Sequence, residues 1–176
     1  MKVVLTGGPC SGKSTLINKL KDLGHKIISE TAREVIEKRN QKFIDKNEII
    51  YRQKEIYSRQ LNKENQESIG FVFLDRSIID GIAYCNFFNI DHSFINTPLN
   101  KRYGLIFLLE QFPFENDGIR VEKKHESLKI HDLIRKTYLD FGYDLINVPK
   151  DNLEKRASFI LNYINQLKGG DENGDC

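Results

Sequence analysis

One segment near the amino terminus constrains the fold of this chain more than any other. Residues 7–15 read Gly-Gly-Pro-Cys-Ser-Gly-Lys-Ser-Thr, which fits the spacing G-x-x-x-x-G-K-[ST] at every fixed position. Glycine at the first and sixth of these positions permits backbone conformations that a Cβ atom would forbid, so successive N–H groups can turn inward around phosphate oxygens. The segment therefore predicts a phosphate-binding loop between a strand and a helix.

The residues around this loop support the same prediction. An apolar run, 3–5, precedes the loop, and apolar residues at helical spacing follow it, as expected for a strand and a helix. Lys13 is expected to reach the β- and γ-phosphates of a nucleotide and Ser14 to offer its hydroxyl to Mg²⁺, beside the positive end of the helix dipole. The expected nucleotide-binding residues are Gly7, Gly8, Pro9, Cys10, Ser11, Gly12, Lys13, Ser14 and Thr15.

Length and composition favour a single domain. The chain has 176 residues, of which 39% are hydrophobic and 30% are charged, and this is enough to bury a core in one domain. We expect the domain to span residues 1–167 and a polar, glycine-rich, disordered tail to span 168–176. The net charge of +2 gives no strong nucleic-acid signal. No apolar run reaches the about 18 residues of a membrane span, and three cysteines without metal-like spacing predict a cytoplasmic protein.

Strand-like and helix-like segments alternate along the chain. Apolar runs predict strands at 3–5, 26–29, 71–74, 105–109 and 144–148. Helical patterns follow the phosphate loop and recur at 31–39, 46–67, 78–88, 126–141 and 153–167. Strands that are separated by helices imply an α/β fold with a mainly parallel sheet covered on both faces. Ligands of such sheets bind at the carboxyl ends of the strands, so the residues there are the candidates for function.

Two charged residues follow the second predicted strand. Glu30 could accept a proton from an attacking hydroxyl group, and Arg33 could bind an anionic group of the acceptor in a bidentate fork. An equally open interpretation is that Glu30 favours the N-terminus of the next helix and that Arg33 is solvated.

Two more charged residues follow the third predicted strand. Asp75 stands where a carboxylate that organises Mg²⁺ is expected in a chain with a phosphate loop, and Arg76 suits a second phosphate or an acceptor. The alternative is that Asp75 caps the following helix, although Ser77 could also do so. The sequence favours the metal-organising role.

Two further basic residues are candidates for contacts with a nucleotide. Arg120 lies in a charged segment, 112–124, that reads either as a flap that neutralises developing charge or as an ordinary surface loop. Arg156, in the last predicted helix, is a candidate for base stacking or phosphate contact.

Short blocks of the sequence resemble known kinases. Asp75, Arg76, Ala83 and Tyr84 are similar to the thymidylate-kinase signature, although Ser77 stands where those enzymes carry tyrosine. Asp75-Arg76-Ser77 also resembles the acid-Arg-Ser motif of deoxynucleoside kinases, whose base is a glutamate placed as Glu30 is here.

A broader likeness covers residues 1–167. There the chain resembles AAA-like P-loop domains grouped with the NadR-type ribosylnicotinamide kinases and the TRP-translocation-defect proteins. The blocks that carry this likeness are Thr6–Thr15, Glu30–Val35, Leu74–Tyr84, Asp117–Arg120, Gly142–Pro149 and Arg156. The resemblance implies a three-layer P-loop NTPase sandwich of the nucleoside-monophosphate-kinase type, with a five-stranded sheet in the order 2-3-1-4-5.

The resemblance also implies a function. It is Mg·ATP-dependent phosphoryl transfer to a small acceptor, a nucleoside or a nucleotide, with GTP left open as the donor. In this interpretation Lys13, Glu30, Asp75 and Arg120 are catalytic, Ser14 and Asp75 hold the metal, and Glu30, Arg33 and Arg76 bind the acceptor. The alternative is a nucleotide-binding regulator or slow NTPase that acts through a protein or anionic-lipid partner, because the family also contains regulators. The identity of the acceptor and the oligomeric state are open.

Overall fold

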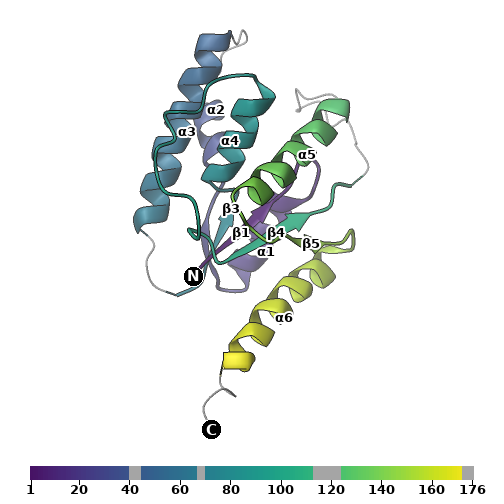
Figure 1. Ribbon diagram of the computed structural model, residues 1–176. Coiled ribbons are helices and arrows are strands. Elements are labelled where there is room, and N and C mark those ends of the chain that lie inside the picture. The colour runs from purple at the N-terminus through teal and green to yellow at the C-terminus, as the bar shows by residue number, and fades with distance from the viewer. Residues whose placement is uncertain (40–44, 67–69, 113–123, 172–176) are drawn as a thin grey trace.

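The computed structural model describes residues 1–39, 45–66, 70–112 and 124–171. These residues form one five-stranded parallel sheet in the order β2-β3-β1-β4-β5 (Figure 1). The strands are β1 (Lys2–Thr6), β2 (Lys26–Ile28), β3 (Val72–Asp75), β4 (Leu105–Leu109) and β5 (Ile146–Val148). The helices are α1 (Lys13–Asp22), α2 (Thr31–Arg39), α3 (Lys46–Gln66), α4 (Ile78–Phe87), α5 (Lys124–Asp140) and α6 (Leu153–Asp171). The predicted fold class and strand order are confirmed.

The sheet is apolar on both faces, which is why its strands read as nearly continuous hydrophobic runs. On one face, Val3 and Leu5 of β1 pack with apolar residues of α1 and α6. On the other face, Val4 packs with apolar residues of α4 and α5. Consecutive residues of β1 thus pack into two separate hydrophobic cores, one on each face of the sheet. The molecule therefore has three layers, with the sheet between two layers of helices (Figure 1).

The register of the central strands brings the candidate residues to one edge of the sheet. Leu5 of β1 is the parallel partner of Asp75 at the end of β3, and β1 runs directly into the phosphate loop. Helix α4 then begins at Ser77 with a capping box, in which the Ser77 hydroxyl and the Asp80 carboxylate each bind a backbone N–H. The cap on α4 is therefore Ser77 and not Asp75, which leaves the Asp75 carboxylate available for another role.

Several predicted boundaries were wrong by a few residues, mostly where polar residues meet the ends of an element. The last strand begins at Ile146, and α5 begins at Lys124. The largest difference is at the carboxyl end, because α6 continues to Asp171 and does not stop at 167. Glycine lowers helix propensity without forbidding a helix, and the prediction gave too much weight to Gly169 and Gly170. Residues 172–176 of the predicted tail lie outside the described residues. In the part of the chain that the structure describes, no helix is both long and apolar enough to cross a membrane.

Candidate active site

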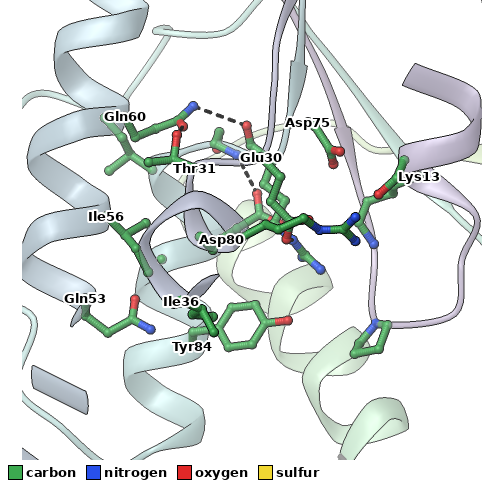
Figure 2. Close-up of a pocket in the computed structure, with 18 of the residues that line it drawn as sticks. Lys13, Glu30, Thr31, Ile36, Gln53, Ile56, Gln60, Asp75, Asp80 and Tyr84 are labelled. Atoms are coloured by element: carbon green, nitrogen blue, oxygen red, sulfur yellow. Dashed lines mark hydrogen bonds and ion pairs between the residues drawn. The ribbon is translucent and has the colours of Figure 1, made fainter. Parts of the chain in front are cut away.

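A cavity of about 750 Å³ opens at the carboxyl ends of the strands (Figure 2). One wall is the phosphate loop from Pro9 to Thr15, and the floor carries residues from the ends of β2 and β3. The opposite wall comes from α2, α3, α4 and the segment after α4, and its apolar side chains are Ile36, Ile56, Tyr57, Tyr84, Phe88 and Ile95. The cavity therefore has a polar half beside the phosphate loop and an apolar half away from it.

The phosphate loop has the backbone that its glycines predicted. Gly7 has a φ of 139°, and a Cβ atom there would lie 2.7 Å from the carbonyl oxygen of Leu109. Helix α5 braces the loop from behind: Gly8 N–H donates to His131 Nδ1 over 3.2 Å, and the Ser127 hydroxyl donates to the Pro9 carbonyl over 3.3 Å. These contacts fix the loop without filling the cavity on its other side.

Lys13 is buried within its own loop. Its ammonium group donates to the carbonyl oxygens of Gly7 and Gly8, each over 2.8 Å, and to the Ser11 hydroxyl over 2.9 Å. Burial, reinforced by the positive charge of Arg76, lowers the pKa of Lys13 to about 7. A phosphate anion against this loop would favour the charged ammonium, so the residue suits the role that the motif predicts.

Asp75 has the properties expected of a carboxylate that binds a cation. It is 3% exposed, and its Oδ1 has no hydrogen-bond partner. Burial and the negative charge of Glu30 raise the pKa of Asp75 to about 6, although Lys13 and Arg76 oppose the shift. Ser14 lines the same cavity. Among the described residues there is no cluster of three or more His, Cys, Asp or Glu side chains suited to a metal, so Mg²⁺ here would need phosphate or water oxygens as its other ligands.

Glu30 and Arg76 form an ion pair in the polar half of the cavity. Arg76 Nε donates to Glu30 Oε1 over 2.9 Å, and the more exposed Arg33 lies 3.9 Å from the other carboxylate oxygen. Burial opposes ionisation of Glu30, but Arg76 and Lys13 outweigh it and lower the pKa of Glu30. Glu30 is therefore an ionised carboxylate inside the cavity, and its environment is more specific than a helix N-terminus alone would require.

Arg76 is held in an unusual backbone conformation. Its φ is 70°, a region that residues other than glycine rarely adopt. Nη1 donates to the carbonyl oxygen of Gly7 over 3.2 Å and to Asp80 Oδ1 over 3.3 Å, and the guanidinium lies over the ring of Tyr84 at 5.3 Å. These contacts aim the guanidinium at the phosphate loop, and strain of this kind is often found at functional sites.

The other two predicted site residues that the structure describes, Arg156 and Arg33, differ in how they lie relative to the cavity. Arg156 is not a cavity-lining residue: it is buried behind the loop, where Nη1 donates to the Ser11 carbonyl over 2.8 Å and the guanidinium lies over the Phe112 ring at 5.0 Å. Arg33 lines the cavity with a side chain that is 61% exposed. Arg120 lies outside the described residues.

The sequence analysis did not identify a buried polar chain that supports the cavity from α3. Thr31 donates to Gln60 Oε1 over 2.5 Å; Figure 2 shows these two side chains next to each other. Gln60 Nε2 donates to Glu64 Oε1 over 3.0 Å. Glu64 is fully buried and accepts a hydrogen bond from Arg102 over 2.8 Å. A signal did exist in the sequence, because Gln60 and Glu64 continue the apolar stripe of Ile56 at intervals of four residues. Polar residues at such core positions indicate a buried network.

Comparisons with known proteins agree with this architecture. The family model described as AAA domain matches residues 2–156. A search of curated proteins gives no match. Among solved structures, deoxyadenosine kinase from M. mycoides, with bound dCMP and dCDP, has a TM-score of 0.69 at 16% identity, over 94% of this chain and 100% of that one.

Two other solved structures share the fold. The NadR protein in complex with NAD and AMP-PNP has a TM-score of 0.71 at 18% identity, over 96% of this chain but only 49% of NadR. Thymidylate kinase from Candida albicans has a TM-score of 0.57 at 16% identity, over 95% of this chain and 92% of that one. The chain belongs to the AAA domain family and has the fold of the P-loop kinases.

Proposed function

We propose that this protein transfers the γ-phosphoryl group of Mg·ATP to a hydroxyl group of a small acceptor, a nucleoside or a nucleotide. One observation carries the proposal: an ionised carboxylate, Glu30, and a guanidinium, Arg76, share one cavity with Lys13 of the phosphate loop. This is the set of groups that phosphoryl transfer to a hydroxyl needs. The names of the fold neighbours, which include deoxyadenosine kinase and thymidylate kinase, support the same reaction class.

On the donor side, the loop amides and Lys13 would bind the phosphates of the nucleotide. Ser14 and the unpartnered Asp75 oxygen would hold Mg²⁺, which when bound neutralises charge on the donor phosphates. The raised pKa of Asp75 fits this role, because a nearby cation favours the ionised carboxylate. GTP remains a second candidate donor.

On the acceptor side, Glu30 would take the proton of the attacking hydroxyl group, and Arg76 would stabilise the negative charge of the transferring group. Arg33 would contact the acceptor from the cavity rim. The apolar half of the cavity, with Ile36, Ile56 and Tyr84, offers surfaces for a flat ring such as a nucleobase. This combination of a polar end and an apolar end fits a nucleoside or nucleotide better than a small polyol.

A screen of acceptors tests the proposal. The purified chain would be incubated with Mg·ATP or Mg·GTP and with each common nucleoside and nucleoside monophosphate, while formation of ADP or GDP is measured. An acceptor that raises the rate at least about tenfold over the acceptor-free rate supports a kinase, provided that Lys13→Ala abolishes the increase. Equal phosphate release with and without every acceptor would overturn the proposal and favour the regulator or slow NTPase.

A further inference from the structure

A buried hydroxyl on α5 is linked to the ion pair in the cavity. Tyr138 is fully buried, and its hydroxyl donates to Asp80 Oδ2 over 2.6 Å. Asp80 in turn accepts a hydrogen bond from Arg76 Nη1. We propose that Tyr138 is a positioning residue for phosphoryl transfer, which acts through Asp80 to fix the Arg76 guanidinium at the phosphate loop. This inference rests on the proposed function.

The Asp80 carboxylate is held by donors from several elements. Oδ2 accepts from Tyr138 and, over 2.9 Å, from the backbone N–H of Ser77. Oδ1 accepts from the Thr6 hydroxyl over 2.5 Å and from Arg76 over 3.3 Å. Both oxygens are therefore satisfied by donors, and their positions depend on β1, the start of α4 and α5 together. If the tyrosine hydroxyl were removed, Oδ2 would keep the Ser77 N–H but lose its side-chain donor from α5, so the carboxylate would be held less firmly.

The Tyr138 hydroxyl is well suited to this task. Burial and the negative charge of Asp80 raise the pKa of Tyr138 well above its usual value, so the phenol remains a donor throughout the physiological range. The Ser77 hydroxyl lies 2.7 Å from the same phenol oxygen, so this oxygen has hydrogen-bond partners on two residues near the start of α4. Tyr138 thus presents a fixed proton to Asp80.

Asp80 is one of the contacts that define the position of the Arg76 guanidinium, which also lies over the Tyr84 ring. The guanidinium has Glu30 on one side, Asp80 on the other and the Gly7 carbonyl in front. During the reaction, Glu30 would weaken its ion pair with Arg76 when its carboxylate accepts the proton of the acceptor hydroxyl. Asp80 is then the carboxylate that keeps Arg76 in place, and Tyr138 keeps Asp80 in place.

Helix α5 also contacts the donor side of the site. On this helix, the Ser127 hydroxyl donates to the Pro9 carbonyl of the phosphate loop, and His131 Nδ1 accepts from the Gly8 N–H. Helix α5 therefore contacts the phosphate loop through its amino-terminal half, and it contacts Asp80, the partner of Arg76, through its carboxyl-terminal half. This arrangement would keep the two sides of the cavity in fixed relation, which in-line transfer requires.

Tyr138→Phe tests the inference, because it removes the hydroxyl and keeps the buried ring. Thr137→Val is the matched control: Thr137 is buried on the same helix, and its hydroxyl donates to the Leu133 carbonyl of that helix, over 2.7 Å. We expect Tyr138→Phe to lower kcat by about 10- to 100-fold with the KM for Mg·ATP nearly unchanged. Thr137→Val should leave both constants unchanged.

A double-mutant cycle with Arg76→Lys identifies the route of the effect. If Tyr138 acts through Arg76, then Tyr138→Phe should lower kcat by less than about threefold in the Arg76→Lys background. Equal fold-losses in both backgrounds would overturn the inference, as would a Tyr138→Phe variant that melts at a lower temperature but keeps its kcat.

The inference and the proposed function fail in different ways. The proposed function fails when the wild-type chain transfers phosphate to no nucleoside or nucleoside monophosphate. In that case the same cycle would be run on hydrolysis of Mg·ATP by water, where additive effects would overturn the inference and a non-additive loss would support it. With an active wild type, additive effects would overturn the inference alone.

Discussion

Arg76 Nε donates a hydrogen bond to Glu30 Oε1 over 2.9 Å, and this contact joins the segments that follow the neighbouring strands β2 and β3 on the floor of the cavity. The two residues are 46 positions apart in the sequence. Their ion pair keeps Glu30 ionised and keeps Arg76 aimed at the phosphate loop. The candidate base and the candidate charge-stabilising group are thus parts of one electrostatic unit. The first prediction below removes a charge of this unit, and the second removes the charge of Lys13 beside it.

Glu30→Gln should lower kcat on an identified acceptor by about 10²- to 10⁴-fold and leave the affinity for Mg·ATP nearly unchanged. The amide keeps the shape of the carboxylate but cannot take a proton. Steady-state kinetics and isothermal titration calorimetry measure the two quantities. Glu34→Gln is the matched control, since Glu34 lies in the first turn of α2, four residues after Glu30, and pairs with Lys63 away from the cavity. Unchanged turnover in Glu30→Gln would exclude Glu30 as the base and direct attention to Asp75.

Lys13→Ala should abolish detectable binding of Mg·ATP and keep the fold. The lysine donates only within its own loop, and its lowered pKa indicates that the buried charge is not a major source of stability. Calorimetric titration checks the binding, and circular dichroism checks the fold. Wild-type affinity in a folded variant would contradict the assignment of the phosphate loop.

Asp75→Asn should stabilise the nucleotide-free protein at pH 8 but not at pH 4. A raised pKa means that the ionised carboxylate costs stability in the folded state. The stability that Asp75 contributes is therefore present below pH about 4 and is lost as the pH rises through about 6. Asparagine does not ionise, so the variant should gain about 1–3 kcal/mol over the wild type at pH 8.

Thermal unfolding at the two pH values measures this difference. The same substitution should abolish Mg²⁺-dependent turnover by removing a candidate metal ligand, so the variant would be more stable and inactive. A lower melting temperature for Asp75→Asn at pH 8 than for the wild type would contradict the prediction.

Gly7→Ala should destabilise the fold by about 3 kcal/mol or more, because a Cβ atom would meet the Leu109 carbonyl oxygen at 2.7 Å in a backbone region nearly exclusive to glycine. Gly142→Ala is the control. Its φ is also positive, at 76°, but a Cβ atom there has no heavy atom within 4 Å, so the cost should be about 1–2 kcal/mol. Denaturant unfolding measures the free energy of unfolding of both variants. Equal losses of this free energy would contradict the prediction, because backbone strain alone, without the contact with Leu109, would then explain both.

The sequence predicted most of the fold because the signals involved are local. The phosphate loop is a run of nine consecutive residues, and the alternation of strands and helices is read from short windows. The predicted bounds of the elements were less accurate, as at the carboxyl end of α6, because glycine lowers helix propensity without deciding where a helix ends. The candidate residues Glu30, Asp75 and Arg76 were identified from their position after strands, which the parallel topology brings to one edge.

The sequence by itself determined which chemical groups would meet at that edge: a phosphate loop, two carboxylates and a guanidinium. Only the tertiary structure decided how they are paired. It bound Glu30 to Arg76, left Asp75 Oδ1 without a partner, placed Arg156 behind the loop and set Asp80 and Tyr138 beneath Arg76. The physical reason is that charges and hydrogen bonds act over a few ångströms between segments far apart in the chain, and folding alone sets those distances.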